Sequence, residues 1–89
     1  MNVWETECVR FLEERLPGTE AWQHALKVNE EAGELGRAIL GRGDVAEECA
    51  DVLISTMLLC ARLGIDVDEV IGAKFRDLWT RTHHDGGIR

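Results

Sequence analysis

The chain has 89 residues, the size of a single domain, and a domain this small buries a smaller share of its surface than a larger one does. Its seventeen acidic and ten basic residues give a formal net charge of −7 at pH 7. This charge disfavours attraction to long nucleic acids and to anionic membranes. We therefore expect no binding to either.

The cysteines and the N-terminal segment indicate in which cellular compartment the protein is expected. Cys8, Cys49 and Cys60 are odd in number and widely spaced, which is typical of small core residues in a reducing environment. Glu5 and Glu7 interrupt any apolar run of the kind that a secretory signal needs, and charges break every stretch of membrane-spanning length. These features predict a cytoplasmic protein.

Apolar residues recur at helical spacing between glycine-marked breaks, and the alternation typical of strands is absent. We therefore predict an all-α chain of four helices, a domain of the four-helix-bundle type. The first helix is expected over residues 3–16 and is ended by Pro17-Gly18. The second is expected from residue 19 or 20 to residue 40, where residues 41–43 allow a tight connection.

The second half of the chain has clearer helix signals. Asp44 is expected to cap a third helix that runs to about residue 63 and stops at Gly64. Asp66 and Glu69 have the spacing of a capping box for a fourth helix, which is predicted to reach about residue 82. Residues 83–89 lack periodicity and are predicted to form a loose tail of this single domain, residues 1–89.

Two pairs of carboxylates stand out. Glu31 and Glu34 lie three residues apart on the second predicted helix, and Glu48 and Asp51 do so on the third. Residues at this spacing are neighbours on a helix surface, so each pair repels itself unless a positive charge lies between its members. The short connection makes the two helices antiparallel, which brings the pairs to comparable heights. Hard divalent cations prefer such oxygen ligands, so we predict a metal site here.

The third predicted helix is apolar around most of its circumference. A helix of this kind belongs in the interior of a bundle, and three short partners in one chain scarcely cover it. We therefore expect a homodimer or a dimer of dimers. The expected interface is helical and centred on residues of the third helix, namely Val52, Met57, Leu59, Cys60 and Leu63.

The acidic stretches have a specific sequence context. Residues 25–35 read Ala-Leu-Lys-Val-Asn-Glu-Glu-Ala-Gly-Glu-Leu, residues 47–53 read Glu-Glu-Cys-Ala-Asp-Val-Leu, and residues 64–66 read Gly-Ile-Asp at a helix start. With these motifs the chain resembles the MazG-like, all-α nucleoside triphosphate pyrophosphohydrolases over about residues 22–81. The resemblance implies that the four paired carboxylates bind Mg²⁺, with Mn²⁺ as an alternative. It also implies that Lys74 and Arg81 approach the triphosphate of the substrate.

An Mg²⁺-dependent pyrophosphohydrolase converts a nucleoside triphosphate to the monophosphate and pyrophosphate, and one or two ions are compatible with the motif. The water that attacks the phosphate is expected to be oriented or deprotonated by Glu30 or by one of the metal ligands, of which Glu31 is a candidate. Lys27 either binds phosphate or forms an ordinary ion pair with Glu31, four residues later. Trp22 is either a base-stacking residue or part of the core.

Two other functions are compatible with the same pattern. A nucleotide- and metal-binding module would keep the fold and the site without turnover, and it would release no pyrophosphate. A purely structural helical oligomer would use the acidic stripes as solubilising faces, and Mg²⁺ would not change its stability.

Overall fold

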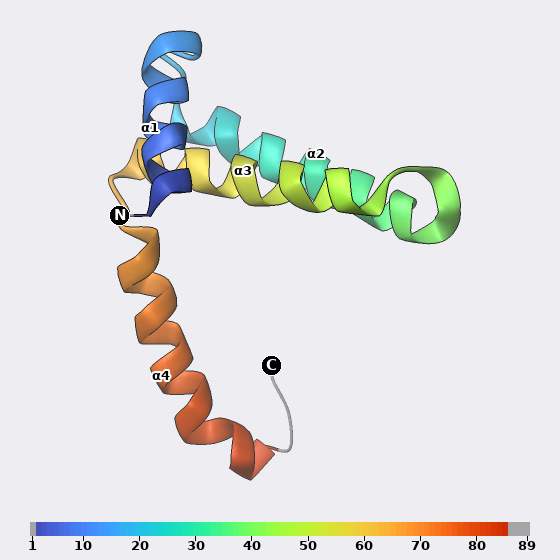
Figure 1. The fold of residues 1–89 in the computed structure, drawn as a ribbon, viewed down its shortest axis with the longest axis vertical. Coiled ribbons are helices and arrows are strands. Elements are labelled where there is room, and N and C mark those ends of the chain that lie inside the picture. The colour runs from blue at the N-terminus through green and yellow to red at the C-terminus, as the bar shows by residue number, and fades with distance from the viewer. Residues whose placement is uncertain (1, 86–89) are drawn as a thin grey trace.

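The computed structural model describes residues 2–85, and within this range the chain is helical and contains no strand (Figure 1). The all-α prediction is confirmed. No helix in this range is both long and apolar enough to cross a membrane. Four α-helices follow one another along the chain: α1 (Val3–Arg15), α2 (Ala21–Arg37), α3 (Val45–Leu63) and α4 (Val67–Asp85).

Local capping defines where these helices begin. Asn2 and Glu5 form a capping box at the start of α1, in which the Asn2 side chain accepts a hydrogen bond from the Glu5 N–H. The Asp44 carboxylate accepts one from the Glu47 N–H at the start of α3, as predicted. Gly64 then ends α3 in the left-handed conformation, with φ 71°. The bounds of α1 and α3 therefore agree closely with the prediction.

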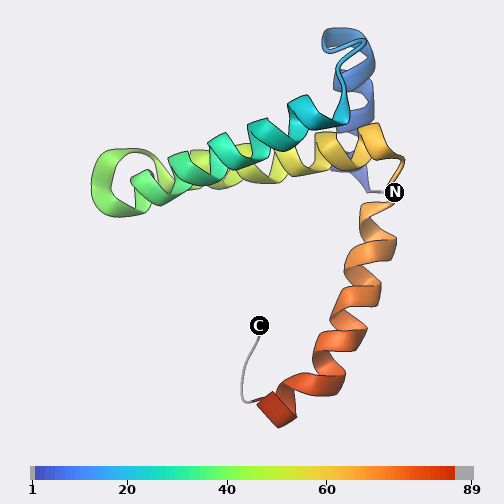
Figure 2. The same cartoon turned by 180° about the vertical axis from the view of Figure 1, so that it is seen from behind.

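Helices α2 and α3 form an antiparallel hairpin, as predicted (Figures 1 and 2). The α-helical hydrogen bonding of α2 ends at Arg37, earlier than expected, and a short π-helical segment, η1 (Ala38–Arg42), leads into the connection. Gly41 turns the chain there with φ 88°. Ala38 is buried under this turn, so the segment closes the end of the hairpin.

The core is small. Helix α1 crosses the C-terminal half of α3, where Cys8 and Leu12 pack against Leu58. Half-buried apolar residues surround this cluster, among them Leu16 and Met57. A core of this size leaves many apolar side chains at the surface.

Helix α4 leaves the hairpin near the N-terminus and lies apart from the other helices (Figures 1 and 2). Glu5 fixes its start, because its Oε2 accepts a hydrogen bond of 3.0 Å from the Val67 N–H. The Asn2 side chain also donates to the Asp68 carboxylate, at 3.2 Å. Within one chain the four predicted helices are thus present, but they do not close into a four-helix bundle; only α1, α2 and α3 pack together.

The end of α4 differs from the prediction. The helix continues through Asp85, so residues 83–85 are helical and not part of a loose tail. No proline or glycine occurs between Gly72 and Gly86, and the backbone can continue its hydrogen bonding to the end of this stretch. The rest of the predicted tail, residues 86–89, lies outside the described residues.

Gly64 offers a test of the helix ends. Replacing Gly64 by Ala forces a side chain into the left-handed region and should lower the free energy of unfolding by about 1 kcal/mol. Replacing Gly36 by Ala, within the regular part of α2 and with no atom near the new Cβ, should raise it by about 0.5–1 kcal/mol. Chemical denaturation of both variants measures this, and equal effects of the two changes would contradict the assigned helix end.

Candidate metal centre

Three of the four predicted ligands meet between α2 and α3. One carboxylate oxygen from each of Glu31, Glu48 and Asp51 lies within 4.8 Å of the other two. Glu31 comes from the middle of α2, and the other two lie one turn apart at the start of α3. The antiparallel hairpin brings them together, as the spacing predicted.

The Glu31 carboxylate is the most buried of the three. Its side chain is only 10% exposed, whereas the side chain of Lys27, one turn earlier, is 56% exposed. The Lys27 ammonium lies 3.4 Å from Glu31 Oε1 and 3.0 Å from Glu30 Oε1. The hydrogen bond to Glu30, together with the two carboxylate charges, raises the pKa of Lys27. The single Lys27 ammonium thus pairs with two carboxylates, and the group formed by Glu31, Glu48 and Asp51 keeps an excess of negative charge.

This excess of negative charge affects the pKa of Glu48. Burial raises its pKa above the ordinary value, and the charges of Asp51, Glu31 and Glu34 raise it further, followed by that of Glu47. Both effects disfavour the ionised form of Glu48. A bound cation would reverse the second effect, because it supplies the opposite charge at the same place.

Glu34 is the predicted ligand that does not join the group of three. Its Oε1 forms an ion pair of 2.8 Å with the Arg37 guanidinium, three residues later on α2. The carboxylate is nonetheless close enough to raise the pKa of Glu48. Glu34 therefore lies at the edge of the group and is paired with Arg37.

The donor set fits a hard divalent cation. It consists of carboxylate oxygens on two helices, with no thiol or imidazole among the three closest groups. Mg²⁺ takes a few carboxylates and fills its remaining positions with water or with substrate phosphates. Three negative charges and one shared ammonium leave a net negative site, which a divalent cation would neutralise.

The other predicted site residues lie farther away or have other contacts. Glu30 is exposed and paired with Lys27 at the edge of the group. Trp22 lies in the first turn of α2, about 13 Å from Glu31 along the helix axis, and its Nε1 donates to Glu20 at 2.6 Å. Lys74 and Arg81 lie on α4, which does not pack against α2 or α3 in this chain. Both approach Asp77, at 4.0 and 3.3 Å.

A partly buried polar network, which the sequence did not reveal, extends the same side of the hairpin. Thr19 donates its hydroxyl hydrogen to the Leu16 carbonyl at 2.8 Å and accepts from the Arg62 guanidinium at 3.1 Å. The buried His24 lies 2.8 Å from that hydroxyl through Nε2, so the neutral ring must donate from this nitrogen. His24 lies two turns before Glu31 and Ser55 one turn after Asp51, and both are buried. The helical spacing of His24 from Glu31 and of Ser55 from Asp51 is the signal in the sequence that could have identified these buried polar residues.

A second acidic group has a structural explanation. Oxygens of Glu5, Asp66 and Asp68 also lie close together, but Glu5 accepts hydrogen bonds from the backbone N–H groups of Asn2 and Val67. Asp66 accepts one from the Glu69 N–H, as expected for the cap of α4. Backbone N–H groups at helix starts stabilise negative charge, so these carboxylates need no cation.

Comparison with known proteins identifies the family. The sequence profile described as phosphoribosyl-ATP pyrophosphohydrolase (PRA-PH) matches residues 10–74, which is most of the chain and includes all three clustered carboxylates. The chain belongs to the phosphoribosyl-ATP pyrophosphohydrolase family. This family is part of the MazG-like, all-α nucleoside triphosphate pyrophosphohydrolase superfamily, so the resemblance seen in the sequence is confirmed. No curated protein and no solved structure matched the chain.

Membership of the PRA-PH family makes the chain a pyrophosphohydrolase, a hydrolase that acts on acid anhydrides. The family implies a nucleotide substrate and is typically metal-dependent. The group formed by Glu31, Glu48 and Asp51 is of the kind that such an enzyme needs. The family does not by itself assign the ligands of this chain.

The clustered charges predict a response to Mg²⁺. Replacing Glu48 by Gln removes a carboxylate whose ionisation its neighbours disfavour, so the metal-free variant should melt at a higher temperature than the parent. Mg²⁺ should raise the melting temperature of the parent and have little effect on the variant. Thermal unfolding with EDTA and with excess Mg²⁺ measures both, and Glu13→Gln, which removes an exposed carboxylate of α1, is the control. An unchanged Mg²⁺ response in Glu48→Gln would contradict the site.

His24 predicts a separate pH effect. Burial lowers its pKa below the ordinary value of 6.5, and the nearby Arg62 lowers it further. As the pH falls below about 6.5, the unfolded chain takes up a proton that the folded chain resists, so stability is lost. His24→Gln keeps a donor for Thr19 and does not titrate, so it should lose less stability between about pH 7.5 and 5.5 than the parent. Parallel pH dependence in denaturant titrations would show that His24 is not the cause.

Proposed function

We propose that this chain hydrolyses a phosphoribosyl-ATP-type nucleotide to the corresponding phosphoribosyl-AMP and pyrophosphate, with Mg²⁺ bound between α2 and α3. The observation that carries the proposal is the meeting of Glu31, Glu48 and Asp51 within 4.8 Å, inside the region that matches the PRA-PH family. The family description supports the substrate class. The carboxylate group supports the metal dependence.

In this proposal Glu31, Glu48 and Asp51 hold the cation. Glu34 is a fourth ligand, and it must exchange its ion pair with Arg37 for the metal. Exposed ion pairs of this kind contribute little, about 0–1 kcal/mol, so the exchange costs little. When bound, the cation neutralises the phosphate charge and lowers the pKa of a coordinated water.

Glu30 is the proposed general base. It is exposed, lies next to the ligand Glu31 and is oriented by the hydrogen bond from Lys27. Water adds its oxygen to a phosphorus atom of the anhydride, its proton passes to Glu30, and the bond between the α and β phosphates breaks to release pyrophosphate. Lys27, at the edge of the carboxylate group, is placed to bind a phosphate oxygen once the cation has taken over Glu31.

The remaining proposed contacts are less direct. Lys74 and Arg81 would bind the phosphates only if α4 of this or another chain approached α2 and α3. Trp22 is 59% exposed near the start of α2, where it could stack only on a part of the substrate distant from the metal. Neither contact is required for the hydrolysis step itself.

Pyrophosphate release tests the proposal. With Mg²⁺, phosphoribosyl-ATP should be hydrolysed at least tenfold faster than ATP or the other common nucleoside triphosphates. Asp51→Asn should lower kcat/KM for phosphoribosyl-ATP roughly 100-fold or more, because a charged ligand contributes several kcal/mol to the transition state through the metal. Glu13→Gln, on α1, should keep the activity.

The assay distinguishes the alternatives. Equal rates for ATP and phosphoribosyl-ATP would contradict the substrate, and undiminished activity of Asp51→Asn would contradict the assigned ligands. Binding of phosphoribosyl-ATP without any pyrophosphate release would indicate a binding module in place of an enzyme.

A further inference from the structure

Two cations flank the acidic residues of α2. Lys27 lies on the side of the helix start and pairs with Glu30 and Glu31. Arg37 is the last residue of the helix and pairs with Glu34. The two cations lie ten residues apart, which corresponds to about 15 Å along the axis of a helix. Lys27 already has a place in the proposed reaction, whereas Arg37 has none beyond its ion pair.

The Arg37 side chain is directed back along α2. A cation in the last turn of a helix commonly interacts with the carbonyl groups at that end. The Arg37 guanidinium instead lies beside Gly33, one turn earlier, where Nη1 and Nη2 are 3.8 and 3.9 Å from the position that a Cβ atom would take. It reaches Glu34 Oε1 at 2.8 Å, and 52% of the side chain is exposed. The guanidinium therefore faces the carboxylates and is open to a ligand.

The ion pair of Arg37 and the proposed metal centre use the same carboxylate. Glu34 raises the pKa of Glu48, so its charge already acts at the clustered carboxylates. An exposed ion pair is weak and can be exchanged. Once Glu34 is a metal ligand, the Arg37 guanidinium has lost its partner and keeps its five N–H donors. Two of these match the oxygens of a phosphate, which an Arg binds in one plane.

The exposed face of α2 changes from apolar to basic along its length. At about 100° per residue, five exposed residues share an arc of roughly 80°, namely Trp22, Leu26, Glu30, Gly33 and Arg37. Trp22 and Leu26, near the helix start, are 59% and 60% exposed. A nucleobase stacks on such side chains, whereas phosphates need cations. A nucleotide laid along this face therefore has its base near the start of α2 and its phosphates towards Arg37.

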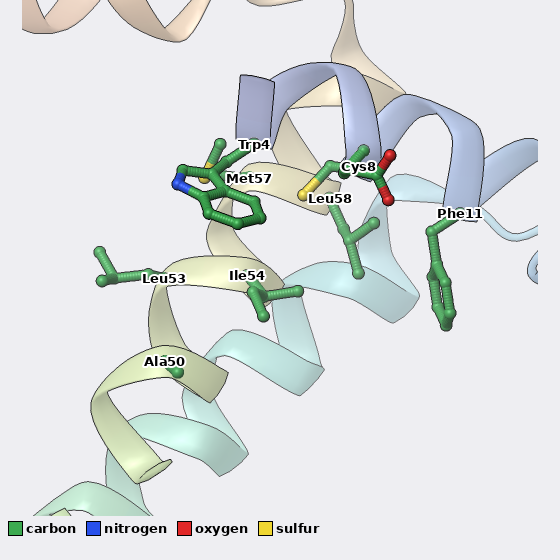
Figure 3. A pocket seen from close by; sticks show the side chains of 9 residues that line it. Trp4, Cys8, Phe11, Ala50, Leu53, Ile54, Met57 and Leu58 are labelled. Carbon is green, nitrogen blue, oxygen red and sulfur yellow. The ribbon is translucent and has the colours of Figure 1, made fainter. Parts of the chain in front are cut away.

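The groove between α1 and α3 offers no alternative place for the phosphates (Figure 3). Its volume is about 640 Å³, and its lining is apolar apart from Glu7, an anion. Phosphates need cations or N–H donors, which this lining does not supply. The carboxylate group lies between α2 and α3 instead. The phosphates are therefore assigned to the side of the hairpin on which α2 lies.

We propose that Arg37 binds the pyrophosphate part of the substrate, and that it does so once Glu34 has exchanged it for the metal. This inference rests on the proposed metal-dependent hydrolysis. Negative charge develops on the β and γ phosphates as the bond to the α phosphate breaks, and a guanidinium at that place stabilises it. Lys27, on the other side of the carboxylates, is left for the α phosphate. Metal binding and phosphate binding are thereby coupled, because one exchange prepares both.

Metal binding by the protein alone is the first test. Arg37→Gln removes the competitor for Glu34, so Mn²⁺ should bind about two- to fivefold more tightly than to the parent. In a Glu34→Gln background the same change should have an effect of less than about twofold, because no exchange takes place. Electron paramagnetic resonance of free Mn²⁺ measures both. Arg10→Gln removes an exposed cation that is paired with Glu7 and Glu14 on α1, so it is the matched control and should leave the affinity unchanged.

Pyrophosphate binding is the second test, and here the effect should have the opposite sign. In excess Mg²⁺, Arg37→Gln should bind inorganic pyrophosphate at least about tenfold more weakly than the parent, because hydrogen bonds between charged groups are lost. Arg10→Gln should bind it as the parent does. Calorimetric titration measures these affinities. Circular dichroism should show unchanged helix content, since the Arg37 side chain is half exposed.

Three outcomes would overturn the assignment. An unchanged affinity of Arg37→Gln for pyrophosphate would mean that Arg37 does not contact the phosphates. Weaker binding of both Mn²⁺ and pyrophosphate would mean that Arg37 only supports the shape of the site. Equally tighter Mn²⁺ binding with and without the Glu34 carboxylate would mean that no exchange occurs. Neither titration contains a nucleotide, so a failure to hydrolyse phosphoribosyl-ATP would reject the proposed substrate and leave the titrations to decide on Arg37.

Discussion

The buried Glu31 carboxylate is the constraint on which the structure depends. Taking a carboxylate out of water costs several kcal/mol unless a compensating charge lies beside it, and the shared ammonium of Lys27 compensates only in part. Glu48 and Asp51 add further negative charge at the same point. The helices α2 and α3 are therefore in contact at a place where their carboxylates repel one another. A bound divalent cation would convert this repulsion into an attraction.

The hairpin is stabilised away from the carboxylates. At the far end from the turn, Thr19, His24 and Arg62 join the segment before α2 to α3 through hydrogen bonds, and α1 packs on α3 nearby. At the turn, η1 closes over Ala38. The acidic group lies between two regions that fix the spacing of the helices. This arrangement preorganises the three carboxylates, so that a cation would meet them already assembled.

Local signals in the sequence were enough for the hairpin. The cap at Asp44, the stop at Gly64 and the three-residue spacing of Glu48 and Asp51 depend on neighbouring residues only. The ion pair between Glu34 and Arg37 is also local, because the two residues lie three apart on α2, and this spacing was available in the sequence. The direction of α4 could not be predicted, because it follows from a hydrogen bond to Glu5, 62 residues earlier.

Anomalous scattering from Mn²⁺-soaked crystals would test the metal centre most directly, since Mn²⁺ binds to the same kind of oxygen ligands as Mg²⁺ and can be located without ambiguity. The account predicts a peak at bonding distance from carboxylate oxygens of Glu31, Glu48 and Asp51. A peak at the group formed by Glu5, Asp66 and Asp68, with none between α2 and α3, would contradict it.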